Sequence, residues 1–181
     1  IEKIYKTEKF LKCTMKYLSS HLEENYPGNL ICKVVYLLNN ENEFSIFFEA
    51  ITDKDTIVNM TNHNYWNFHG HKNTYQNIAN HSVLLNADNI CEIDESYIPT
   101  GFIKKVKENK FDMNSFYNIS QNFLEEGGID HNYILKYANL QKPDGIIFSN
   151  ITGMGVEYFT DQPGMQFYTG NMMDTSIKGK Y

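Results

Sequence analysis

The chain has 181 residues, of which 41% are apolar and 14% aromatic, so it has enough apolar material for a packed core and extensive disorder is excluded. Its formal net charge is −6 and all 16 basic residues are lysines, which excludes the basic field of a nucleic-acid or anionic-membrane partner. Without arginine there is also no bidentate clamp for phosphate or carboxylate, although a biased base composition of the gene would equally explain that absence.

The predicted elements are mostly short strands. The opening segment, 1–11, reads as a helix. The aliphatic run 30–38 and the apolar run 44–51 flank a polar turn, and together they predict a hairpin. A second helical segment is predicted at 114–126. Further strands are predicted at 56–60, 81–86, 102–106, 133–137, 145–149 and 155–160.

Such an order of short strands, punctuated by Gly, Pro and Asn, predicts a mostly β protein with an antiparallel sandwich or barrel. No composition break or fixed repeat divides the sequence, so we expect a single domain over residues 1–181.

Two Pro-Gly pairs predict type II turns, in Tyr26-Pro27-Gly28 and in Gln162-Pro163-Gly164. Because side chains alternate along a strand, the strand after the second turn is expected to direct Gln166 and Tyr168 toward one face.

The three cysteines, Cys13, Cys32 and Cys91, are odd in number and lack CxxC spacing, which predicts reduced thiols in an intracellular protein. No apolar run reaches the roughly 20 residues of a membrane span. The first residues also lack the pattern of a signal peptide. We therefore predict a cytoplasmic protein.

Three residues are candidates for chemistry on a polar ligand. His63 lies among Asn and aromatic residues, and histidine exchanges protons near neutral pH. Asp130 follows a glycine pair that lets the backbone approach a ligand closely, and Gln166 could bind a hydroxyl group. Each of the three would also fit a purely structural role. A metal site of His63 with His69 and His71 is an alternative, but a loop with solvated histidines is favoured and no metal site is predicted.

Several strings, taken in order, resemble the aldose 1-epimerases, also called galactose mutarotases. These strings are Asn25-Tyr26-Pro27-Gly28-Asn29-Leu30, Asn59-Met60-Thr61-Asn62-His63-Asn64-Tyr65-Trp66-Asn67, Ile98-Pro99-Thr100-Gly101 with Phe111-Asp112, Gly128-Ile129-Asp130-His131-Asn132, and Pro163-Gly164-Met165-Gln166-Phe167-Tyr168-Thr169-Gly170-Asn171. The resemblance implies the antiparallel β-sandwich of that family and the interconversion of α and β anomers of free hexoses such as galactose and glucose.

By the resemblance, His63 matches the catalytic histidine, while Asn62, Tyr65, Asp130 and Gln166 fall among the residues that bind the sugar. In that reaction a base takes the proton of the C1 hydroxyl and an acid protonates the ring oxygen, which opens the ring for rotation and reclosure. His63 would be the acid. The resemblance implies no metal and no organic cofactor. We expect His63, Asp130 and Gln166 to lie together in one groove.

The resemblance covers only the middle of the family's chain. The family's base is a glutamate downstream of the last string, and its arginine and second histidine come from an earlier portion. Glu157 belongs to an upstream strand and is not assigned as the base. We therefore expect a fragment that lacks N- and C-terminal portions of the sandwich and exposes strand edges through which it could self-associate. A non-catalytic carbohydrate-binding remnant or regulator is the main alternative. A phosphosugar epimerase is disfavoured by the lack of arginine.

Overall fold

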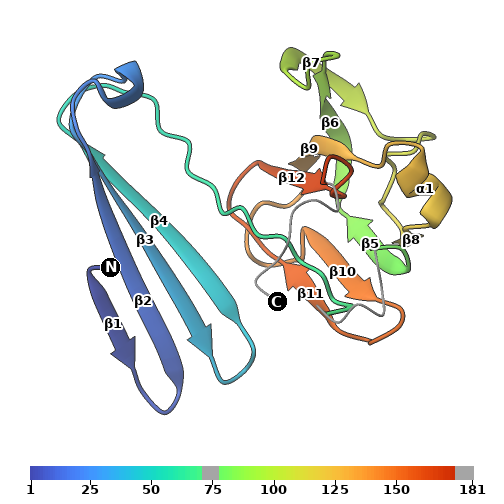
Figure 1. Cartoon of the computed structure of the whole chain (residues 1–181), viewed down its shortest axis with the longest axis horizontal. Coiled ribbons are helices and arrows are strands. Elements are labelled where there is room, and N and C mark those ends of the chain that lie inside the picture. Colours follow the sequence, from blue (N-terminus) through green and yellow to red (C-terminus); the bar gives the residue numbers. More distant parts are fainter. Residues whose placement is uncertain (71–77, 174–181) are drawn as a thin grey trace. The chain divides into compact units, whose positions relative to one another are not determined.

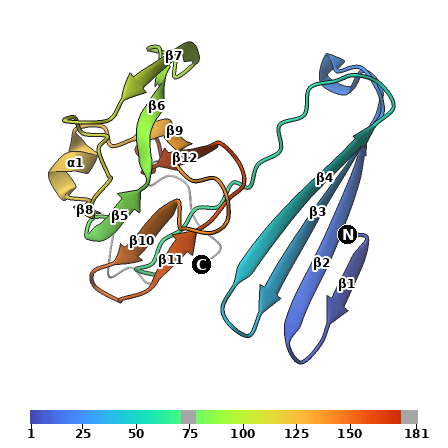
Figure 2. The same cartoon turned by 180° about the vertical axis from the view of Figure 1, so that it is seen from behind.

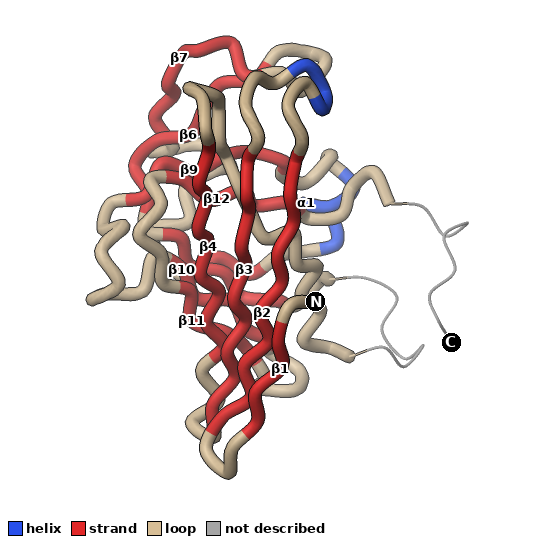
Figure 3. Tube along the Cα trace, turned by 90° about the vertical axis from the view of Figure 1, so that its left-hand side faces the viewer, coloured by secondary structure: helices blue, strands red, loops and turns tan. Residues whose placement is uncertain are grey.

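The computed structural model describes residues 1–70 and 78–173, and it separates the chain into two compact units, Ile1–Asn64 and Tyr65–Tyr181. Strands dominate both units, and the described residues contain only two short helices (Figure 3). None of the helices in these ranges is long and apolar enough to cross a membrane. The expectation of a single domain over 1–181 stays a prediction.

The first unit is an antiparallel meander with the strand order β1-β2-β3-β4 (Figure 1). The helical prediction for residues 1–11 is wrong, because pairing between strands overrides the local preference of this lysine-rich segment. The predicted hairpin is confirmed as β3 and β4. The bounds are β1 Lys3–Lys6, β2 Phe10–Ser19, the 3₁₀ helix η1 Glu23–Asn25, β3 Leu30–Asn39 and β4 Phe44–Thr52.

One face of this sheet is almost entirely apolar. The register places side chains from all four strands on it, among them Ile4, Leu11, Cys13, Met15, Val34, Tyr36, Leu38, Phe44, Ile46 and Phe48. The edge strand β1 is short and carries Lys3 and Lys6, whereas the edge strand β4 has nine residues and neither Lys nor Pro. Lysine and short length are features that protect a strand edge, so β4 is the less protected edge of this sheet. Self-association through it stays a prediction.

At the turn of Pro27 and Gly28, the φ of Gly28 is +86°, the sign that the predicted type II turn requires at this position. A Cβ at this position would lie 2.8 Å from the Thr52 hydroxyl oxygen, so glycine is required for space as well as for φ. The Asp53 carboxylate accepts hydrogen bonds from the backbone N–H and side-chain amide of Asn29, both at 2.7 Å. The beginning of β3 is therefore tied to the end of β4.

The second unit contains two four-stranded antiparallel sheets, ordered β11-β10-β5-β8 and β12-β9-β6-β7 (Figure 2). The predicted mostly β, antiparallel class is confirmed. The bounds are β5 His81–Leu85, β6 Ala87–Ile93, β7 Pro99–Lys105, β8 Tyr117–Asn118, the helix α1 Gln121–Glu125, β9 Asp130–Leu135, β10 Gly145–Ser149, β11 Gly155–Tyr158 and β12 Gly164–Tyr168.

Two further predicted elements differ from the structure. Residues 56–60 form no strand. The predicted helix 114–126 is limited to α1, because the Ser120 hydroxyl accepts a hydrogen bond from the Phe123 N–H at 3.2 Å and so caps the helix start.

The core of the second unit lies where side chains of both sheets meet. Asn86 alone separates β5 from β6, so one continuous stretch of chain passes from the first sheet to the second. The Asn86 side-chain amide donates to the Pro143 carbonyl at 2.8 Å and fixes this corner. The buried apolar cluster comprises Val83, Leu85, Ala87, Ile90, Val106, Met113, Ile119, Phe123, Ile129, Tyr133 and Phe167.

His81 lies at the edge of this core and is only 3% exposed. Its ring Nδ1 is 2.8 Å from the Ile78 carbonyl oxygen, and its Nε2 accepts the Phe68 N–H at 3.1 Å. The two partners assign a neutral ring with the proton on Nδ1. Burial, and to a smaller degree the nearby His69, lower the pKa of His81.

We expect the free energy of unfolding to fall as the pH is lowered from about 7 toward 5. The unfolded histidine has a pKa of about 6.5, so below this pH the unfolded chain binds a proton that folded His81 does not, and the unfolding equilibrium shifts accordingly. His131, whose pKa burial also lowers, acts in the same direction. Urea titrations followed by the fluorescence of Trp66, the single tryptophan, measure this.

The variant His81→Gln supplies an acceptor for the Phe68 N–H but does not titrate, so it should show a smaller loss of stability between pH 7 and 5. An equal loss in this variant and in the wild type would contradict the assignment to His81.

Candidate functional site

The clearest polar site of the second unit lies on β9 and the edge strand β12, which pair antiparallel at one side of the unit's second sheet. In the register, Asp130 is opposite Tyr168 and Asn132 is opposite Gln166. Since alternate residues share a face, Asp130, Asn132, Gln166 and Tyr168 lie on one face. The other face carries Phe167 and residues of the buried core. The predicted common face for Gln166 and Tyr168 is confirmed.

Asp130 and Gln166 contact each other directly. The Gln166 side-chain amide donates a hydrogen bond of 2.7 Å to Asp130 Oδ1. No second partner for either side chain is found among residues 1–70 and 78–173, so the second carboxylate oxygen and the amide oxygen are left as acceptors. Gln166 is exposed and Asp130 half-buried. Two adjacent acceptors suit hydroxyl donors, the polar groups that a sugar presents.

Aromatic rings border this pair. The Tyr65 and Tyr168 rings meet edge to face, with centroids 6.3 Å apart, and Tyr65 is 59% exposed. The Tyr168 hydroxyl accepts the Met172 N–H at 2.9 Å, which fixes the ring. Flat apolar rings beside polar acceptors provide both kinds of contact that a sugar ring requires.

Asn132 is part of this face, although the sequence did not single it out. The Cys91 thiol on β6 is 3.7 Å from Asn132 Oδ1, as donor to acceptor. On the other side, a Cβ at Gly164 would lie 2.6 Å from the same oxygen. Gly164 has no positive φ, so the predicted type II turn at Pro163 is wrong, and the glycine instead leaves room for Asn132. The sequence signal that could have placed Asn132 on this face is its spacing of two residues from Asp130 along one strand.

His131 points to the opposite side of the sheet from Asp130. Its ring packs on Phe111, with centroids 4.4 Å apart, and burial lowers its pKa while the Asp130 charge raises it less. Its Nδ1 is buried and has no partner among the residues that the structure describes. His131 is therefore a neutral packing residue behind the polar face.

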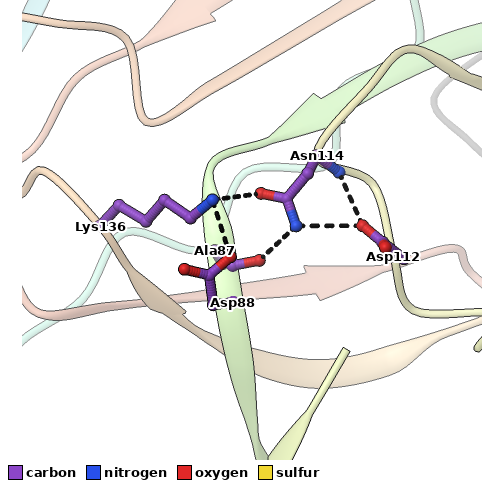
Figure 4. Close-up of polar contacts among 5 residues, drawn as sticks. All are labelled: Ala87, Asp88, Asp112, Asn114 and Lys136. Atoms are coloured by element: carbon purple, nitrogen blue, oxygen red, sulfur yellow. Dashed lines mark hydrogen bonds and ion pairs between the residues drawn. The ribbon is translucent and has the colours of Figure 1, made fainter. Parts of the chain in front are cut away.

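A polar network holds the loop before β8 against β6 and β9 (Figure 4). The Lys136 ammonium is 2.7 Å from an Asp88 carboxylate oxygen and donates to Asn114 Oδ1 at 2.8 Å. The Asn114 amide donates to the Ala87 carbonyl at 2.9 Å and to Asp112 at 3.0 Å. The hydrogen bonds that the side-chain amide and the backbone N–H of Asn114 donate to the Asp112 carboxylate lower the pKa of Asp112. The Asp112 of the sequence string thus has a structural role.

Asn62 and His63 belong to the first unit, in a stretch without regular secondary structure after β4. The structure brings together three of the predicted residues, Tyr65, Asp130 and Gln166, in one neighbourhood of the second unit. The groove that would join them to His63 stays a prediction. His71 lies outside the described residues, and within those residues no group of three His, Cys, Asp or Glu side chains could hold a metal ion.

Comparisons with known proteins find relatives over most of this chain. The family model described as aldose 1-epimerase matches residues 3–181. The galactose mutarotase of Bos taurus is 37% identical over 160 residues, which are 87% of this chain and 46% of that protein. The aldose 1-epimerase of Haemophilus influenzae is 34% identical over 158 residues, 83% of this chain and 45% of its own length. The chain therefore spans about half the length of these relatives.

Two solved structures share the fold. A galactose 1-epimerase from Lactobacillus acidophilus matches with a TM-score of 0.77 and 24% identity, over 94% of this chain and 50% of that one. An aldose epimerase homologue from C. elegans matches with a TM-score of 0.80 and 20% identity, over 95% and 52%. These two likenesses show the fold, and the match of the family model to residues 3–181 shows that the chain belongs to the aldose 1-epimerase family.

Proposed function

We propose that this chain is the sugar-binding part of an enzyme that interconverts the α and β anomers of free hexoses such as galactose and glucose. The observation that carries the proposal is the Asp130–Gln166 pair, whose remaining acceptors lie beside Tyr65 and Tyr168. Asp130 and Gln166 would accept hydrogen bonds from sugar hydroxyls, and the aromatic rings would contact the C–H surface of the sugar.

In this proposal His63 is the acid that protonates the ring oxygen, an assignment that rests on its match to the family's catalytic histidine. Asn62 and Tyr65, its neighbours in the string, would contact the same sugar. The chemistry uses proton transfer alone, with acid and base contributing about 10²- to 10⁴-fold each. The resemblance assigns the base to a glutamate that no residue of this sequence matches.

A galactose titration of the isotope-labelled chain, followed by NMR, tests the binding proposal. We expect galactose to shift the side-chain amide resonances of Gln166 and also the ring resonances of His63. Asp130→Ala should weaken binding at least about tenfold, because it removes a charged acceptor. Asp161→Ala is the matched control, since Asp161 accepts the Gln162 amide at 2.8 Å away from the polar face. Shifts of Gln166 without any response of His63 would contradict a shared site.

Polarimetry on freshly dissolved α-D-galactose tests the catalytic part. We expect the 181-residue chain to accelerate mutarotation little, because water replaces a positioned carboxylate poorly as a base. Acceleration to the level of a full-length relative, abolished by His63→Asn, would show that another residue of this chain acts as the base. Sugar binding without acceleration would leave the non-catalytic carbohydrate-binding role.

A further inference from the structure

We infer that Thr169 is a positioning residue for the Asp130–Gln166 pair, an inference that rests on the proposed function. Thr169 directly follows β12 and is only 6% exposed. Within the described residues its side chain bonds to Ile129 and Asn171 and to neither member of the pair, so its effect on the sugar site passes through the backbone before β9.

The Thr169 hydroxyl holds the residue that precedes Asp130. Its oxygen accepts the Ile129 N–H at 2.8 Å, and the hydroxyl lies 3.2 Å from the Ile129 carbonyl oxygen, to which it donates. The Thr169 backbone N–H donates to the same carbonyl at 3.0 Å. Ile129 itself is 1% exposed, so these groups have little access to water. Three hydrogen bonds therefore join the end of β12 to the beginning of β9.

This attachment lies at the end of the ladder that carries the site. Asp130 opposite Tyr168 is the last residue pair between β9 and β12, and the Thr169 side chain continues the pairing one step further. Strand ends fray where no further pairing restrains them. Fixing Ile129 therefore fixes the backbone from which the Asp130 carboxylate reaches Gln166 across the diagonal of the ladder.

Gly128 shows how close this contact is. A Cβ at position 128 would lie 2.2 Å from the Thr169 hydroxyl oxygen, and the φ of Gly128 is +56°. A methyl group in place of the hydroxyl would need about 3.5 Å or more from the Ile129 nitrogen and from Gly128. The variant Thr169→Val, similar in volume, must therefore push the segment before Asp130 away from Gln166.

The test compares Thr169→Val with Thr169→Ser, which keeps the hydroxyl. We expect the galactose dissociation constant to rise about 3- to 10-fold in the valine variant and to change less than about twofold in the serine variant. Thr160→Val is the matched control. Thr160 is also buried, and its hydroxyl accepts a backbone N–H, that of Gln162, at 3.0 Å, so it loses the same kind of hydrogen bond away from the pair.

A second readout needs no sugar. In Thr169→Val the Gln166 side-chain amide resonances should move toward their positions in Asp130→Ala, where the Asp130 acceptor is missing, and Thr160→Val should leave them unchanged. If the wild-type chain binds no galactose and Thr169→Val still shows this response, the proposed function is overturned and the positioning is supported. Equal amide resonances and affinities in Thr169→Val and Thr160→Val would overturn the inference. If the valine variant does not fold, Thr169→Ala removes the hydroxyl without adding a methyl group beside Gly128.

Discussion

Replacing Gly128 by alanine is expected to lower the free energy of unfolding of the second unit by about 3 kcal/mol. Roughly 1 kcal/mol arises because a residue with a Cβ is disfavoured at the φ of +56°. The remainder comes from overpacking, since the new methyl group would lie 2.2 Å from the buried Thr169 oxygen and the segment must shift. Urea unfolding followed by Trp66 fluorescence measures the loss.

Gly127→Ala separates the two causes. Gly127 also has a positive φ, of +92°, but a Cβ there would meet nothing within 4 Å. We expect this variant to show the backbone cost alone. In a Thr169→Ala background, Gly128→Ala should become less costly because the clashing oxygen is absent. The same cost in both backgrounds would rule out the close approach as the cause.

Asp144→Ala is expected to cost about 2–4 kcal/mol of unfolding free energy, because it leaves two backbone donors without an acceptor. Asp144 is 0% exposed, and its carboxylate accepts the Ala138 N–H at 3.0 Å and the Thr160 N–H at 3.1 Å. Ala138 has a φ of +44°, so this carboxylate also holds a strained backbone position in the loop between β9 and β10.

The control for Asp144 is Asp94→Ala. Asp94 also accepts two backbone N–H groups, of Ser96 at 2.8 Å and Ile98 at 3.0 Å, but its turn is exposed and water can replace the lost acceptor. We expect the control to lose less than about 1 kcal/mol. Similar losses of unfolding free energy in the two variants would mean that burial does not determine how much the Asp144 hydrogen bonds stabilise the fold.

The strands that sequence patterns predicted well are those with their own local signal. Residues 145–149 form β10 with the predicted bounds, and 30–38 falls within β3, because aliphatic and β-branched runs favour a pleated, half-buried surface. The helical prediction for residues 1–11 failed because strand pairing sets their conformation, β1 with the adjacent β2 and the start of β2 with the end of β3. The strand β12 was predicted only from the turn signal at Pro163 and from the alternation of Gln166 and Tyr168.

For the candidate site, alternation along one strand was enough to place Gln166 and Tyr168 on one face. The contact of Gln166 with Asp130 depends on the register between two strands 36 positions apart, which no local pattern specifies. Only the resemblance of both strings to one family predicted that the two residues share a site. The role of Thr169 depends on the same register, so it emerges only from the folded structure.

The two-sided character of β9 has a consequence for mutational tolerance. Asp130 and Asn132 face outward, whereas the alternate residues His131 and Tyr133 pack inward, with Tyr133 at 0% exposure. A saturation library across this strand should therefore show tolerance with a period of two: outward positions accept many substitutions without loss of expression, and inward positions accept few. Under the proposed function, selection for altered sugar preference would find its variants at every second residue, so that binding and abundance could evolve separately along a single strand.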